Sequence, residues 1–124
     1  MGLGEDCDEI AIFSGEHINI LDWIRDSKYN FKYNENAIDG AAGNGYINVL
    51  DWFHGMKYDF LCTSTAIDSA SENGHVNVLK WFEEHSYNIK YSRYAIIGAA
   101  SNGNIDALKW IKIIKINLYT QNKQ

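Results

Sequence analysis

Histidines and carboxylates are the side chains of this sequence that could transfer protons or bind a metal. The 124 residues include four histidines, His17, His54, His75 and His85. His17 and His75 occupy equivalent positions, two units apart, in a 29-residue repeat. If each unit is a helix pair of ~10 Å thickness, the two rings are separated by roughly 20 Å. That distance is too long for a shared metal or proton, so we expect a local hydrogen bond beside a turn.

Two aspartates and two cysteines are the remaining candidates for chemistry. Asp39 and Asp68 lie one unit apart, and neighbouring units could match the roughly 6.5–9.5 Å between the carboxylates of inverting glycosidases. Nothing in the surrounding sequence supplies a substrate pocket for this pair. Cys7 and Cys62 lie outside any C-x-x-C or Cys/His spacing, so we expect two reduced thiols. The sequence therefore predicts no catalytic residue, no cofactor, no metal site and no enzymatic activity.

The 29-residue period organises the chain. The four tryptophans, Trp23, Trp52, Trp81 and Trp110, follow one another at this spacing without insertion or deletion. A leucine lies two positions before each tryptophan, and an Asn-Gly pair recurs at 44–45, 73–74 and 102–103. Self-similarity at a fixed period indicates units that bury their apolar faces only against their neighbours. We therefore expect the tryptophans to belong to the core.

Each unit contains two apolar patterns of helical period, joined by the Asn-Gly pair. In the second unit, mostly small residues at 37, 38, 41 and 42 form one face of an inner helix, and residues 47–53 form the wider apolar stripe of an outer helix. Because both flanks are helical, we expect the glycine to end the inner helix in the left-handed C′ position, rather than to form a β-hairpin turn. The good N-cap residues Asn34, Thr63 and Ser92 predict inner helices beginning at about residues 35, 64 and 93.

The motif A-I-D-x-A-[AS]-x-N-G-x-[IV]-N-V-L-x-W-F at 37–53 and 66–82 resembles the core of the ankyrin repeat. Alanine occupies the family's proline position, and Asp39 and Asp68 occupy its histidine position. With its tryptophans and short period, the chain looks like the divergent ankyrin proteins of giant DNA viruses of amoebae. The resemblance implies an all-α fold, an ankyrin-type α-solenoid of four stacked helix-turn-helix pairs with shortened hairpin loops. It also implies a single domain over residues 1–124, with units of about 5–33, 34–62, 63–91 and 92–120.

Several positions that are equivalent under this period change their residue type from unit to unit. In the ankyrin resemblance these positions face the concave groove, where Tyr and Arg are typical anchors of a protein interface. Free drift of solvent-exposed positions explains the same variation equally well. We expect a protein–protein interaction module whose groove binds an unknown partner protein through Tyr33, Glu35, Asn36, Ser64, Thr65, Glu72, Tyr91, Arg93, Tyr94 and Ser101.

The charge and hydropathy of the sequence indicate which other classes of partner to expect. The formal net charge is −5, with 11 acidic and 4 basic residues in 1–62 and 5 acidic and 7 basic residues in 63–124. A negative chain is a poor ligand for phosphates, so we expect no nucleic-acid partner. No apolar run approaches the ~20 residues of a membrane span, and no signal peptide is recognisable. We expect a soluble, intracellular protein with no membrane partner, located in the host cytoplasm if it is viral.

The C-terminal end presents apolar residues without an obvious cover. A helix that continues from Trp110 places Ile111 and Ile114 on a different side from Ile113 and Ile116. Residues 117–124 could fold back as a cap; otherwise we expect a monomer or a weak homodimer through the C-terminal face. The alternative function is therefore a structural or self-assembling component that associates through this uncapped end. In such an assembly, the acidic N-terminal unit of one copy could also meet the basic C-terminal helix of another.

Overall fold

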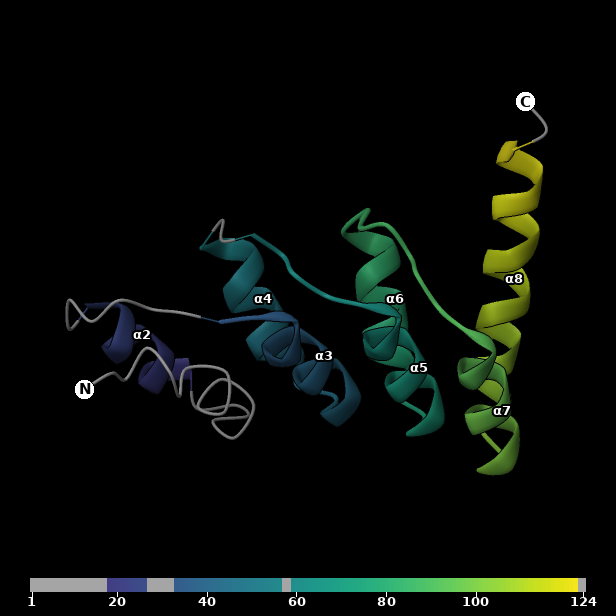
Figure 1. The fold of residues 1–124 in the computed structure, drawn as a ribbon, viewed down its shortest axis with the longest axis horizontal. Helices are drawn as coiled ribbons and strands as arrows, with labels where there is room; N and C mark the ends of the chain where they lie inside the picture. The colour runs from purple at the N-terminus through teal and green to yellow at the C-terminus, as the bar shows by residue number, and fades with distance from the viewer. Residues whose placement is uncertain (1–17, 27–32, 57–58, 123–124) are drawn as a thin grey trace.

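The structure is a computed structural model that describes residues 18–26, 33–56 and 59–122, and this part of the chain is helical without a β-strand. The helices are α2 (Ile18–Asp26), α3 (Glu35–Asn44), α4 (Ile47–Gly55), α5 (Ser64–Glu72), α6 (Val76–Glu84), α7 (Arg93–Ser101) and α8 (Ile105–Asn122). They lie in one row, with α2 at one end, the pairs α3/α4 and α5/α6 in the middle, and α7/α8 at the other end (Figure 1). The predicted all-α class is confirmed.

The inner helices α3, α5 and α7 begin where the N-cap residues predict. The side chains of Asn34, Thr63 and Ser92 accept hydrogen bonds from the backbone N–H two residues later, at 2.8, 3.1 and 3.2 Å. Each of these bonds satisfies one of the backbone N–H groups that the first turn of a helix leaves unpaired. The capping residues therefore fix the starts of these helices at equivalent positions.

The Asn-Gly pairs end the inner helices as expected. Gly45, Gly74 and Gly103 have φ of +76°, +73° and +69°, which is the left-handed region. In the first of these turns, the N–H of Gly45 donates to Ala42 O at 3.2 Å and the N–H of Tyr46 donates to Ala41 O at 2.9 Å. The two bonds form a Schellman motif. The chain then turns directly into the outer helix α4, and α6 and α8 follow their glycines in the same way.

Small side chains allow the inner helices to pack closely. Ala37, Ala41, Ala66, Ala70 and Ala95 are fully buried. The larger apolar residues of the outer helices, such as Leu50, Phe53, Leu79 and Phe82, complete the same core. Residues 59–63 and 87–92, with neither helix nor strand, connect one helix pair to the next. The core is therefore a spine that runs along the row of helices.

Candidate partner-binding surfaces

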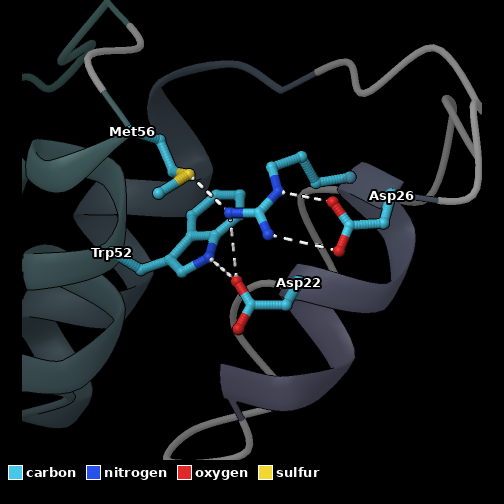
Figure 2. Close-up of polar contacts among 5 residues, drawn as sticks. Asp22, Asp26, Trp52 and Met56 are labelled. Atoms are coloured by element: carbon cyan, nitrogen blue, oxygen red, sulfur yellow. Dashed lines mark hydrogen bonds and ion pairs between the residues drawn. The ribbon is translucent and has the colours of Figure 1, made fainter.

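A tryptophan and a carboxylate connect each outer helix to the outer helix before it. The indole Nε1 of Trp52 donates to Asp22 Oδ1 at 2.8 Å (Figure 2), that of Trp81 donates to Asp51 Oδ1 at 2.7 Å, and that of Trp110 donates to Glu83 Oε1 at 3.2 Å. The three rings are 6%, 4% and 6% exposed. We call this contact between successive outer helices the tryptophan joint. For these three tryptophans, the expectation of a core position is confirmed.

For the first tryptophan that expectation is wrong, because Trp23 is 61% exposed. The joints show the physical reason: each buried indole packs toward the helix pair before it, and its acceptor lies 27 or 30 residues earlier. Among the described residues no helix precedes α2, so none of them supplies such an acceptor for Trp23. A tryptophan at the repeat position is therefore buried only where a preceding pair supplies the other half of the joint.

Charged side chains lie around the first joint: Arg25 contacts Asp22 and Asp26, and Figure 2 labels both aspartates. Its guanidinium lies 3.3 Å from Asp22 Oδ1 and 2.9 Å from Asp26 Oδ1, and it also donates to the sulfur of Met56. The hydrogen bond from Arg25 lowers the pKa of the exposed Asp26 carboxyl. Ion pairs at such an exposed site contribute little to stability. Within this cluster, Arg25 contacts the same Asp22 oxygen that accepts the Trp52 indole.

Asp39 and Asp68 form a second connection, between inner helices. Asp39 accepts hydrogen bonds from both the backbone N–H and the hydroxyl of Thr63, at 2.9 and 2.6 Å. Asp68 accepts the same two bonds from Ser92. Each carboxylate thus holds the N-cap residue of the next inner helix with both oxygens. Sequence reasoning missed this role, although a carboxylate precedes two of the N-cap residues by the same 24 positions.

The Asn-Gly turns also connect neighbouring units. Asn73 Nδ2 donates to Gly43 O at 2.8 Å, and Asn102 Nδ2 donates to Glu72 O at 3.1 Å, so each amide caps the inner helix before it. The ring of His75 lies against Gly45, where an added Cβ would come within 2.9 Å of Nδ1. The histidine position beside the turn therefore packs against the preceding unit.

The structure places most of the predicted partner-binding residues at the two ends of the inner helices. Side chains at the helix starts and ends are separated by about 14 Å, the length of a nine-residue helix. The starts carry the exposed Glu35, Asn36, Thr65, Arg93 and Tyr94 and the half-buried Ser64, and the ends carry the exposed Glu72 and Ser101. The predicted residues therefore form two bands along the row of helices rather than one cluster.

The start of α7 has the most prominent side chains of these bands. Tyr94 is 58% exposed. The guanidinium carbon of Arg93 lies 5.3 Å from the centre of the Tyr94 ring, and Arg93 Nη2 also donates to the Tyr94 hydroxyl at 3.4 Å. A cation and an aromatic ring in this arrangement attract each other. The pair presents a broad surface of the composition that protein interfaces favour.

Tyr33 and Tyr91, the other two predicted residues, have a structural role. Both are half-buried and pack against the core. The Tyr33 ring lies 5.1 Å from that of Phe53, and its hydroxyl donates to the backbone carbonyl of Asp59. This bond ties the segment before α3 to the connection after α4. Removing either ring would therefore change stability as well as any binding surface.

A cluster of histidines and aromatic rings on the outer side was not anticipated from the sequence. The ring centres of His54 and His85 are 4.8 Å apart, and His54 Nδ1 lies 2.7 Å from the hydroxyl of Tyr87. His85 stacks on Trp81 at 4.1 Å and donates from Nδ1 to the carbonyl of Trp81. Burial raises the pKa of Tyr87, and the nearby Cys62 adds to the effect. The regular recurrence of tyrosine at positions 29, 58 and 87 was the sequence feature from which such a cluster could have been predicted.

The exposed side of the last unit is unusually apolar. Ile111 and Ile114 are buried, whereas Ile113 and Ile116 are 56% and 54% exposed, which confirms that they lie on different sides of α8. On α7, Ile96 is 42% exposed, although the equivalent residues of α3 and α5 are buried. The difference arises because α5 and α7 pack on those earlier residues and no described helix packs on α7 from that side.

Comparisons with known proteins assign neither a family nor a function to the chain. No protein-family model, no curated protein and no solved structure matches the chain. Within the residues that the structure describes, no three side chains of His, Cys, Asp or Glu gather as they would around a metal ion. The helices of the same residues are all too short or too polar to cross a membrane.

Proposed function

We propose that the chain is a non-enzymatic module of the ankyrin type, a solenoid of stacked helix pairs that binds a partner protein through its concave groove. One observation carries the proposal. The inner helices begin at equivalent positions with equivalent N-caps, and the third residue after each cap is a fully buried alanine, Ala37, Ala66 or Ala95. The two positions between cap and alanine differ in every unit. A constant scaffold thus displays variable side chains.

The exposure of these side chains supports recognition over packing. The first variable position holds Glu35, Ser64 or Arg93, and the second holds residues that are exposed in all three helices. Since those residues contribute little to the core, their chemistry is available to a partner. Tyr94 and its cation contact with Arg93 provide the largest such surface. An intracellular location, in the host cytoplasm if the chain is viral, belongs to the same proposal.

The test requires a partner, which affinity purification from the native host cell would identify. For the purified pair, we expect Tyr94→Ala and Arg93→Ala each to weaken binding by about tenfold, the effect of about 1.4 kcal/mol. Both side chains are exposed, so the melting curve should not change. Lys80→Ala, on the exposed side of an outer helix, is the matched control.

A wider set of substitutions decides whether the groove is the site at all. Tyr33 and Tyr91 are left intact because they pack against the core. Simultaneous replacement of the exposed Glu35, Thr65, Glu72, Arg93 and Tyr94 by alanine should abolish binding. Full affinity in that variant would exclude the groove and move recognition to another face of the protein.

A further inference from the structure

The Asn-Gly pairs that end the inner helices are chemically reactive as well as structural. They are Asn44-Gly45, Asn73-Gly74 and Asn102-Gly103. An asparagine followed by glycine is the dipeptide most prone to deamidation, because glycine has no side chain to shield its backbone nitrogen from the neighbouring carboxamide. Each inner helix is therefore followed by a turn whose asparagine can react without an enzyme.

Deamidation at such a pair depends on the position of the glycine nitrogen. This nitrogen attacks Cγ of the asparagine, so that an N–Cγ bond forms, the bond from Cγ to the amide nitrogen breaks, and ammonia leaves with the glycine proton. Water then opens the cyclic imide at either carbonyl carbon, which gives aspartate or its β-linked isomer. Ring closure therefore needs a glycine nitrogen that is free of its hydrogen bond and turned toward the asparagine Cβ.

The folded turns hold the glycine nitrogen away from this reaction. The N–H groups of Gly45, Gly74 and Gly103 each donate to the carbonyl three residues earlier, at 3.2 Å in every turn. Asn73 and Asn102 have ψ of 2° and 6°, which turns the following nitrogen away from their own Cβ. A turn must open before its asparagine can react, so the rate of deamidation follows the population of the open form.

The asparagine side chains are held by hydrogen bonds too. Asn44 Nδ2 donates to Gly40 O at 2.8 Å, within its own helix. Asn73 Nδ2 donates instead to Gly43 O of the preceding unit, also at 2.8 Å. Deamidation replaces this NH₂ group by a carboxylate oxygen, which can only accept hydrogen bonds. The reaction at residue 73 would therefore remove a connection between two units.

Two of the turns are covered by a side chain of the next unit. An added Cβ at Gly45 would meet the His75 ring at 2.9 Å, and one at Gly74 would meet the Asn104 side chain at 3.0 Å. Asn104 also donates from Nδ2 to two backbone carbonyls at the end of α5. Contacts this close hinder rotation of the covered glycine, so the covering side chain has to move before the turn can open.

We propose that these turns are sites of spontaneous deamidation from which the next unit protects the chain. His75 protects Asn44 in this way, and the side chain of Asn104 does the same for Asn73. The modification is thereby coupled to the separation of adjacent helix pairs. Units that stay in contact keep their asparagine, whereas units that separate convert it irreversibly to a carboxylate. At residue 73 the product has lost its bond to Gly43 O, so the contact is weaker after the reaction.

Mass spectrometry of the full chain tests the protection. The protein is incubated at physiological temperature and mildly alkaline pH, either folded or unfolded in guanidinium chloride, and proteolysis then gives the rate at each asparagine separately. We expect Asn44 and Asn73 to react at least about tenfold more slowly in the folded chain, the factor that corresponds to an opening free energy of about 1.4 kcal/mol. Equal rates in the two states would overturn the proposal.

Removal of a covering side chain gives the sharper test. His75→Ala should raise the rate at Asn44 about fivefold relative to the rate at Asn102, which is the effect of one lost contact on an opening equilibrium. Asn102 is the internal reference because it lies in another turn of the same molecule, so a general loss of stability raises both rates and leaves their ratio unchanged. Asn77→Ala, on the exposed side of the same outer helix as His75, is the matched control and should not change the ratio.

A second variant tests the other covered turn independently. Asn104→Ala should raise the rate at Asn73 about fivefold relative to the rate at Asn44, whose cover by His75 is intact in this variant. The two variants should therefore accelerate different asparagines. Unchanged ratios in both variants would refute protection by the next unit. A lower rate at Asn44 in His75→Ala would also refute it, because it would mean that the imidazole promotes the reaction.

Discussion

The tryptophan joint predicts a large difference between two tryptophans at equivalent positions. Trp81 is 4% exposed, its Nε1 donates to Asp51, and its ring stacks on His85 at 4.1 Å. Truncation of a buried tryptophan to alanine costs about 3–5 kcal/mol, through lost burial and the cavity left behind. Trp23 is 61% exposed, so Trp23→Ala should change the free energy of unfolding by about 0.5 kcal/mol or less.

Urea unfolding followed by far-ultraviolet circular dichroism measures both effects. For an m-value of about 2 kcal/mol/M, a loss of about 4 kcal/mol moves the midpoint down by about 2 M. Trp81→Ala should show a shift of this size, and Trp23→Ala should leave the midpoint almost unchanged. The measurement belongs at micromolar concentration, where association between copies makes the smallest contribution.

A double-mutant cycle separates the hydrogen bond of the joint from the burial of the ring. Trp81→Phe removes the indole N–H and keeps an aromatic ring, and Asp51→Ala removes the acceptor at 2.7 Å. We expect a coupling energy of about 1 kcal/mol between the two substitutions. Equal destabilisation by Trp23→Ala and Trp81→Ala would refute the argument, since it would mean that stability does not depend on contact with a preceding pair.

Two further predictions concern backbone and packing within the inner helices. Gly45→Ala and Gly103→Ala should each lower the free energy of unfolding by about 1–2 kcal/mol, because their backbone is left-handed. Gly45→Ala should lower it more, because its Cβ would meet His75 at 2.9 Å, while nothing lies within 4 Å at Gly103. Equal losses in urea would exclude the His75 contact as a cause. Ser71→Ala should raise stability by about 1 kcal/mol in thermal melts, because the buried hydroxyl has no hydrogen-bond partner among the described residues and alanine already stands at the equivalent Ala42. Destabilisation would indicate that the hydroxyl has a partner in solution.

Local and periodic features of this chain were predictable from its sequence. The inner helices start after Asn34, Thr63 and Ser92 because a capping side chain needs only the backbone two residues away. The glycines are left-handed because a helix ending this way requires a residue without a Cβ penalty. The two sides of α8 follow from helical periodicity alone. Each of these properties depends on residues close together in the sequence.

The candidate binding surface was predictable only in part, because exposure depends on neighbours. Tyr94 is exposed as expected, but Tyr33 and Tyr91 pack against the core. Sequence periodicity marks which positions vary, and it does not show which of them are covered by a connection folding back over them. The contact between His54 and His85 was not predicted either, because it joins residues from successive units and repeat spacing alone does not show which side chains meet.

The sequence by itself determined the period, the helix ends and the residues available for each joint. Only the tertiary structure decided which joints are complete, because burial belongs to a pair of surfaces and not to a residue. Trp23 and Trp81 occupy equivalent positions, and of the two only Trp81 has a preceding outer helix among the described residues. Ile96 differs from Ile67 in the same way: α7 packs over Ile67, whereas no described helix packs over Ile96, which is 42% exposed.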